Sequence, residues 1–187
     1  MSESKIETWL KAGYVLLGTE GLDGVKIERL ARVLNLNKSG FYYYFKTMEG
    51  FVKSLLHYHV HVANNVAAEI KLCETIDPDL LLLMVRHRSF FLVDAQLLVK
   101  SRLAHSGADV DEAGKIITNE LLLFWQRNNE ATGNTAGSFA HLNIIRHFIY
   151  ARIDPDNVTY EFLHDLAAET RKAFEKVPTD RGVSSNG

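Results

Sequence analysis

Apolar residues recur at intervals of three and four along most of the chain, and no segment alternates with the two-residue period of a strand. In the first helix they are Ile6, Leu10, Tyr14 and Leu17, and this helix is expected to end near Gly18 and Gly21. Further helices are predicted around 30–34, 38–45, 47–70, 78–104, 109–129, 137–152 and 157–176, with a loop at 128–137. The pattern therefore predicts an all-α protein.

Two Asp-Pro pairs punctuate the second half of the chain, Asp77-Pro78 and Asp154-Pro155. An Asp side chain can accept a hydrogen bond from the free N–H groups of a helix start, and Pro is tolerated at the first helical position. We therefore expect a helix to begin at each pair.

Composition is that of an ordinary globular protein, with 47% hydrophobic and 24% charged residues in 187. The single cysteine, Cys73, cannot form an intramolecular disulfide, and the first residues lack the apolar segment of a secretion signal. The longest aliphatic run, 80–85, is too short to span a membrane. These features predict a cytoplasmic protein.

The formal net charge of −2 conceals a basic segment. Residues 25–53 contain six Lys or Arg side chains and only two acidic ones. The positive charge is therefore concentrated early in the chain.

The basic segment has the features of a helix-turn-helix. Leu30, Ala31 and Leu34 share the inward face of its first helix, and Asn35 can adopt the left-handed conformation that ends it. Leu36 would fill the turn.

The next short helix is predicted to start at an Asn37 N-cap and to be anchored in the core by Phe41 and Phe45. The side chains that remain free to face outward are Lys38, Ser39, Tyr42 and Tyr43. A short exposed helix of this kind suits the DNA major groove, because its first residues reach base edges while hydroxyl and ammonium groups hold phosphates.

The sequence Phe41-Tyr42-Tyr43-Tyr44-Phe45 resembles the end of the helix-turn-helix in the Tet-repressor (TetR) family of bacterial transcriptional regulators. The resemblance extends over about residues 6–53. It implies a homodimer that places one recognition helix per subunit in successive major grooves. It also implies a repressor that a small-molecule effector releases from a palindromic operator.

The resemblance also assigns roles to single residues. Lys38, Gly40 and Tyr43 match base-facing positions of the family, and Tyr42 and Tyr44 match positions that contact the DNA backbone. Lys26 stands where the family usually has Thr or Ser, and Met48 where it usually has Lys. Either Lys46 or Thr47 supplies the contact of that Lys, or the contact is absent. The DNA-binding residues predicted in this way are Lys26, Asn37, Lys38, Ser39, Gly40, Tyr42, Tyr43, Tyr44, Lys46 and Thr47.

Three units are expected: a helix-turn-helix domain at 1–46, a ligand-binding and dimerisation domain of five to six helices at 47–177, and a disordered tail at 178–187. Aromatic and His residues of the second unit are either core or the lining of an effector pocket; the candidates are Tyr58, His87, Phe90, Phe91 and Trp125. Its last two helices are unusually apolar, which favours a dimer interface containing Leu142, Ile145, Phe148, Ile149, Phe162 and Leu166.

Catalytic chemistry has little support. His57 and His61 lie one helical turn apart, but no third ligand follows at a natural spacing, so neither a metal nor another cofactor is expected. The chain has no Gly-rich phosphate loop and no nucleophile elbow, and we predict that it is not an enzyme. The alternatives to a DNA-binding regulator are a helical dimer that binds only a ligand or a protein, and a helical-bundle enzyme.

Overall fold

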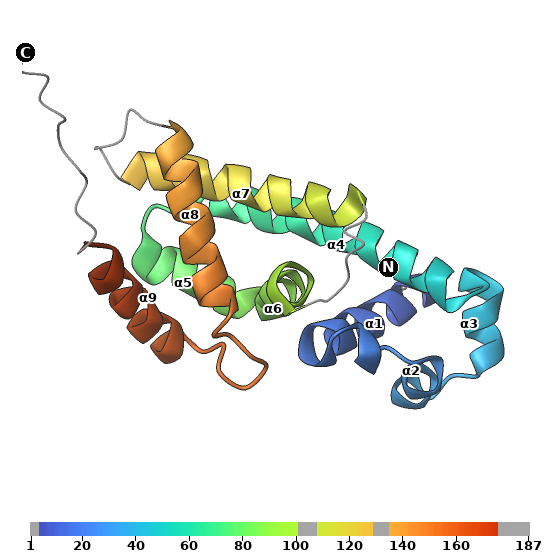
Figure 1. The fold of residues 1–187 in the computed structure, drawn as a ribbon. Coiled ribbons are helices and arrows are strands. Elements are labelled where there is room, and N and C mark those ends of the chain that lie inside the picture. Colours follow the sequence, from blue (N-terminus) through green and yellow to red (C-terminus); the bar gives the residue numbers. More distant parts are fainter. Residues whose placement is uncertain (1–3, 101–107, 129–134, 176–187) are drawn as a thin grey trace, which may run out of the picture.

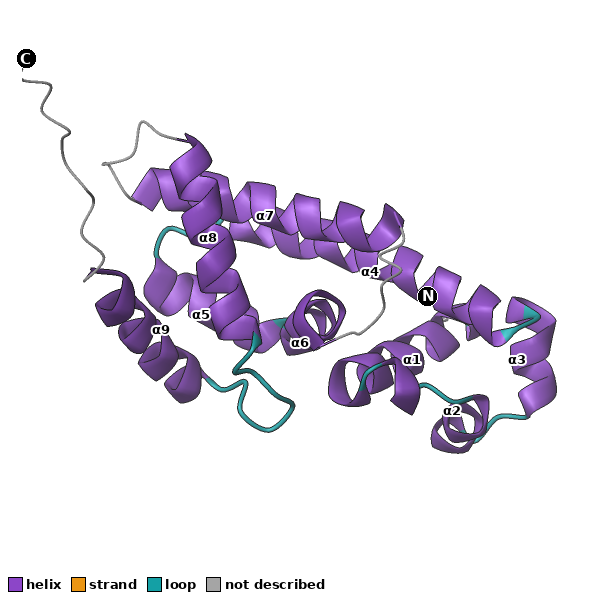
Figure 2. Cartoon of the chain, in the orientation of Figure 1, coloured by secondary structure: helices purple, strands orange, loops and turns teal. Residues whose placement is uncertain are grey.

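A computed structural model describes residues 4–100, 108–128 and 135–175, and these contain nine α-helices and no strand (Figures 1 and 2). The prediction of an all-α protein is confirmed. The expected tail at 178–187 and most of the expected loop at 128–137 lie outside the described residues. The helices are α1 (Lys5–Glu20), α2 (Ile27–Leu34), α3 (Lys38–Phe45), α4 (Met48–Ile70), α5 (Leu81–Arg86), α6 (Arg88–Ala95), α7 (Ala108–Asn128), α8 (Thr135–Tyr150) and α9 (Tyr160–Glu175).

Local sequence signals set the ends of the first four helices. Ser4 caps α1 by accepting a hydrogen bond from the Glu7 N–H at 3.2 Å, and Gly21 ends it at φ +72°, where a residue without a Cβ is favoured. Asn35 ends α2 in the left-handed conformation, φ 52° and ψ 42°. Thr47 caps α4 through its hydroxyl oxygen, which accepts from the Gly50 N–H at 3.0 Å.

Helix α4 belongs to two hydrophobic cores. Near its start, Phe51 and Leu55 pack with α1, α2 and α3, and farther along Val66 and Ile70 pack among α5 to α9. The crossing of α1 and α4 is close: a Cβ on Gly13 would lie 2.5 Å from the Phe51 ring. One continuous helix thus joins the N-terminal helices to the rest of the described residues.

The C-terminal helices form a bundle around the second core. Helix α7 lies along α4, while α8 crosses α7 and leads into α9, which packs on α5 (Figure 1). Helix α6 contacts both α1 and α8. It thus lies between the N-terminal helices and the end of the bundle.

Two predicted helix boundaries are wrong. The helix expected over 78–104 is interrupted at His87 (φ −100°, ψ 28°), which separates α5 from α6. Glu69 of α4 accepts a hydrogen bond from Arg86 and contacts the His87 ring, each at 2.9 Å. The sequence has no Gly or Pro at the break that could have predicted it. The contacts with α4 determine where the break lies.

The second error concerns Asp154-Pro155, which begins a turn and not a helix. The Asp154 carboxylate accepts from the N–H groups of Asp156 and Asn157 at 2.8 and 3.1 Å, and this local turn uses the side chain that was expected to cap. Helix α9 starts only at Tyr160, where the Thr159 hydroxyl accepts from the Phe162 N–H at 3.3 Å.

None of the helices in the described ranges is both long enough and apolar enough to cross a membrane. Within the same residues, no group of three His, Cys, Asp or Glu side chains is arranged to hold a metal ion. His57 and His61 are both exposed on α4.

Candidate functional site

Helix α3 lies at the end of the molecule farthest from α9 (Figure 1), and its two faces differ sharply. Its inner face is formed by Phe41 and Phe45, both buried. The Phe41 ring meets the edge of Trp9 at 5.5 Å between centroids and lies 5.1 Å from Phe51. This aromatic packing fixes the orientation of α3 on α1 and α4.

The outer face of α3 exposes the residues predicted to bind DNA. Tyr43 is 71% exposed and Tyr42 is 49% exposed, while Tyr44 is half-buried with its ring 5.0 Å from that of Tyr43. A Cβ added to Gly40 would meet nothing within 4 Å. The backbone of α3 can therefore approach another molecule closely at this point.

The polar residues among the ten predicted to bind DNA lie near the start and the end of α3. Asn37 caps the helix, accepting from the Ser39 N–H at 3.0 Å, as predicted from the sequence. Lys46 follows the helix at φ +63° and donates to the Tyr43 carbonyl at 2.9 Å. Lys26 and Thr47 are exposed at the starts of α2 and α4. The structure thus brings all ten residues to one end of the protein.

Lys38 is not free in this arrangement. Its ammonium group donates to Glu28 of α2 at 2.9 Å, and the hydrogen bond and charge of Lys38 lower the pKa of the Glu28 carboxyl. Both side chains are well exposed, so the pair is weak and can open when a phosphate or a base edge competes for the lysine.

This pair leads to a first prediction. Glu28→Gln frees Lys38 and removes a negative charge beside the interface, and we expect it to tighten DNA binding about two- to five-fold at low salt. Fluorescence anisotropy with a labelled duplex measures the change. Glu49→Gln, which removes a carboxylate that makes no ion pair with Lys38, is the matched control. Weaker binding by Glu28→Gln would contradict the assignment of Lys38.

A cavity of about 500 Å³ lies in the C-terminal bundle. Most of its lining is aliphatic or aromatic, with polar side chains at a few points. Of the five sequence candidates, Phe91 and Trp125 line it; Tyr58 packs on Tyr14, Phe90 stacks on His59, and His87 contacts Glu69. The lining residues are Ile76, Leu80, Leu81, Met84, Phe91, Leu121, Phe124, Trp125, His141, Leu142, Ile145, Arg146, Ile149, Tyr150, Ala167, Thr170 and Arg171.

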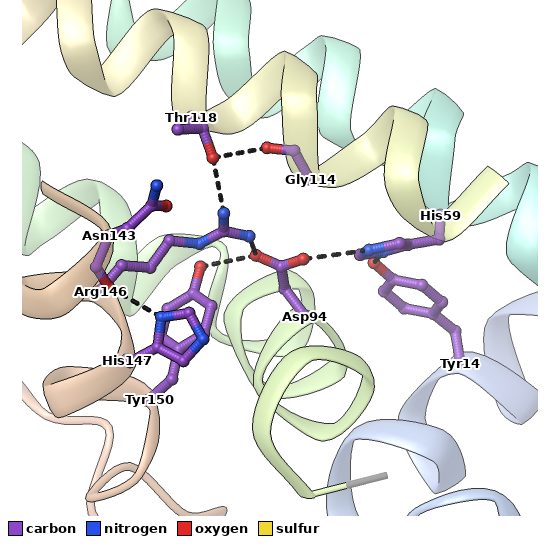
Figure 3. Close-up of polar contacts among 9 residues, drawn as sticks. All are labelled: Tyr14, His59, Asp94, Gly114, Thr118, Asn143, Arg146, His147 and Tyr150. Carbon is purple, nitrogen blue, oxygen red and sulfur yellow. Dashed lines mark hydrogen bonds and ion pairs between the residues drawn. The ribbon is translucent and has the colours of Figure 1, made fainter. Parts of the chain in front are cut away.

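A chain of buried polar side chains runs from this cavity to α1 (Figure 3). Arg146, in the cavity wall, donates to Thr118 and to Asp94, each at 2.6 Å, and the Tyr150 hydroxyl donates to the same Asp94 oxygen at 2.7 Å. The other Asp94 oxygen lies 3.5 Å from His59, and the far nitrogen of that ring lies 2.7 Å from the Tyr14 hydroxyl. Each of these residues is at most 6% exposed.

The charges in this chain stabilise one another. Burial alone raises the pKa of the Asp94 carboxyl, but the charge of Arg146 and the contacts with His59 and Tyr150 lower that pKa to about 2. Burial also raises the pKa of Tyr14 and of Tyr150, so both hydroxyls keep their protons at neutral pH. Asp94 is therefore ionised and paired inside the protein.

None of these buried polar residues was among the predicted site residues, although the sequence contains a signal for Asp94 and Arg146. Asp94 interrupts an apolar stretch at 90–95, and Arg146 follows two isoleucines on a helix whose other inward positions are apolar. A single charged residue at a core-facing position is rarely buried without a partner. Two such residues of opposite charge could have been proposed as a pair.

The predicted dimer-interface residues differ in accessibility. Leu142 and Leu166 are buried within the chain, and Ile145 and Ile149 line the cavity. Phe148 and Phe162 are half-buried. Among the described residues of α8, the large apolar side chains that are exposed are instead Phe139, at 45%, and Ile144, at 56%.

Comparison with known proteins identifies the N-terminal helices. Residues 10–55 match the family model described as bacterial regulatory proteins of the tetR family. These residues form a TetR-family N-terminal domain. The matched TetR segment contains the helix-turn-helix and the first third of α4, which confirms the resemblance noted from the sequence.

The TetR-type fold extends over the rest of the chain. The crystal structure of a Rhodococcus sp. protein assigned to the TetR family of transcriptional regulators has a similar fold, with a TM-score of 0.55 and 14% sequence identity. The likeness covers 91% of this chain and 96% of the other. No curated protein matches the sequence. The family match over residues 10–55 supports a DNA-binding transcriptional regulator.

Proposed function

We propose that this protein is a sequence-specific repressor that binds a palindromic operator as a homodimer and is released by a small molecule. The observation that carries the proposal is the outer face of α3, which presents Lys38, Tyr42 and Tyr43 beside an open backbone at Gly40. Lys38 and Tyr43 would read base edges, and the hydroxyls of Tyr42 and Tyr44 would hold phosphates.

The flanking residues complete this interface. Lys26, Lys46 and Thr47 lie where they could contact the backbone of the same duplex, and the Ser39 hydroxyl lies in the first turn of α3. Asn37 would act mainly by holding the helix start, since its side-chain oxygen is already bonded to Ser39 N–H. The aromatic core beneath α3 keeps these groups in a fixed relative arrangement.

Selection of bound duplexes from a random DNA library tests this function. A two-fold dimer with one α3 per subunit should enrich an inverted repeat whose half-sites are centred about one helical turn, or a multiple of it, apart. Enrichment of no sequence, with no binding to any duplex at low salt, would contradict the proposal. It would favour the alternative of a module that binds only a ligand or a protein.

The effector would occupy the cavity of the C-terminal bundle, since its volume lies within the range of sites for small organic ligands. Phe91 and Trp125 would supply aromatic contact there. Product formation from a small molecule, without any DNA binding, would instead favour the helical-bundle enzyme.

The dimer would form through α8 and α9, whose candidate contact residues are the exposed Phe139 and Ile144 and the half-buried Phe148 and Phe162. Ile144→Glu places a charge on this surface without opening the core, and we expect monomers at micromolar concentration in sedimentation velocity. Leu72→Glu, at an 80% exposed position after α4, is the matched control and should leave the dimer intact. A wild-type protein that sediments as a monomer would contradict this interface.

A further inference from the structure

We propose that the cavity binds an apolar molecule carrying one carboxylate, that Arg146 receives this group, and that Asp94, His59 and Tyr14 transmit the binding to α1. The inference rests on the proposed function only in calling the ligand an effector. Binding in the cavity and its transmission to α1 can both be measured without DNA.

The lining determines the chemistry of the ligand. The charged or titratable side chains that line the cavity are Arg146, Arg171, His141 and Tyr150, and the described lining includes no Asp or Glu. The remaining lining is almost entirely apolar. An apolar body with a negative group complements such a cavity, whereas a cationic ligand would meet only like charge or neutral groups.

Arg146 has a donor left over. Its two terminal nitrogens are bonded to Thr118 and Asp94, but Nε is buried with no hydrogen-bond acceptor among the described residues. A buried donor without a partner is costly, so a ligand oxygen that satisfies it gains binding energy. A charge-assisted hydrogen bond from a guanidinium to a carboxylate is among the stronger contacts available.

The same donor explains how binding can alter the protein. Nε is shielded from the cavity in the free protein, so a carboxylate can reach it only if the guanidinium turns. Turning changes the contact between Arg146 and Asp94. The ligand therefore makes different contacts with two orientations of the Arg146 guanidinium. A ligand can shift an equilibrium between two states only if its contacts with them differ.

The remaining contacts in this series of buried polar side chains lead to α1, in the N-terminal domain. The next contact, between Asp94 and His59, is also the loosest, at 3.5 Å, and the His59 nitrogen on that side makes no hydrogen bond among the described residues. A shift of Asp94 can close or open this gap. His59 is stacked on Phe90 and its other nitrogen holds the Tyr14 hydroxyl at 2.7 Å, so movement of the ring acts directly on α1 (Figure 3).

Binding is tested with matched probes. Isothermal titration of the full-length protein compares decanoate with decan-1-ol, and 4-phenylbutanoate with 4-phenylbutan-1-ol. At least one carboxylate is expected to bind about ten-fold or more tightly than its alcohol. If neither carboxylate binds more tightly than its alcohol, the assignment of a carboxylate ligand is wrong.

Variants identify the arginine that receives the carboxylate. The double variant Arg146→Gln/Asp94→Asn removes both buried charges together and should reduce the carboxylate preference to about two-fold or less. Arg171→Gln, which removes the exposed cation of the lining, should keep it. Loss of the preference in Arg171→Gln, whether or not the double variant folds, would overturn the role of Arg146.

Transmission is tested by amide hydrogen exchange in α1. Saturation with the preferred carboxylate should change exchange of α1 amides by about five-fold or more in the wild type and by less than about two-fold in Tyr14→Phe. Tyr160→Phe is the control. It removes a hydroxyl that donates to Asp77 and takes no part in the buried polar contacts from Arg146 to Tyr14, so this variant should respond like the wild type. An unchanged response in Tyr14→Phe would overturn the relay. Failure to bind any duplex would contradict the proposed function. The titration and the hydrogen-exchange measurement would still test ligand binding and its transmission to α1, because neither uses DNA.

Discussion

Replacing Asp94 with Ala is expected to destabilise the protein by about 3–5 kcal/mol, because it leaves the Arg146 guanidinium buried without its counter-charge. Asp94 is 3% exposed and Arg146 is 6% exposed, so solvent cannot replace the missing carboxylate. The free energy of unfolding, measured by urea titration at pH 7, gives the effect. A decrease below about 1 kcal/mol would show that the pair is no stronger than a surface ion pair.

A double variant and the pH dependence of the free energy of unfolding provide controls for the Asp94–Arg146 pair. Asp94→Ala/Arg146→Met removes both charges and should recover a large part of the stability, since an apolar replacement of a buried pair is often neutral. The pKa of Asp94 is lowered from 3.8 to about 2 in the folded protein. The stabilising contribution of its ionised form is therefore complete above about pH 4 and is lost as the pH falls towards 2.

The second large effect is expected from Phe41→Ala. This ring is fully buried against Trp9, Phe45 and Phe51, and its removal should cost about 3–5 kcal/mol and disorder α3. DNA binding should be abolished together with the stability of the N-terminal helices. Thermal unfolding followed by near-ultraviolet circular dichroism measures the change.

Tyr43→Ala is the matched control on the same helix. Tyr43 is 71% exposed, so its removal should change the free energy of unfolding by no more than about 0.5 kcal/mol. The two variants thus distinguish residues that build the interface from residues that would contact DNA. Equal destabilisation by both would contradict the division of α3 into a buried and an exposed face.

The helix-turn-helix was predictable from sequence because its signals are local. Asn37 caps α3 through a contact two residues away, Asn35 ends α2 through its own backbone conformation, and Phe41 and Phe45 are one turn apart. The spacing of these residues contains the information needed to place them. The predicted bounds of α3 agree with the structure for the same reason.

The helices that follow α4 depend on contacts between residues distant in sequence. The break at His87 is positioned by Glu69, and the Asp94 pair joins residues 52 positions apart. The apolar pattern distinguishes a buried face from an exposed one, but it does not determine which inward residues meet and which face a cavity. For this reason only Phe91 and Trp125 of the five pocket candidates reach the cavity, and Leu142 and Leu166, assigned to a dimer interface, are buried within the chain.

The proposed function requires that α3 read the base sequence. The salt dependence of binding to the selected operator and to a scrambled duplex, measured for wild type, Tyr43→Ala and Lys46→Ala, distinguishes base reading from contact with the DNA backbone alone. Tyr43→Ala should reduce discrimination between the two duplexes by about 1–3 kcal/mol for each base edge that the tyrosine reads. Lys46→Ala should weaken binding to both alike and reduce the salt slope by about one unit per subunit. Equal effects of Tyr43→Ala on both duplexes would show that this helix does not read bases.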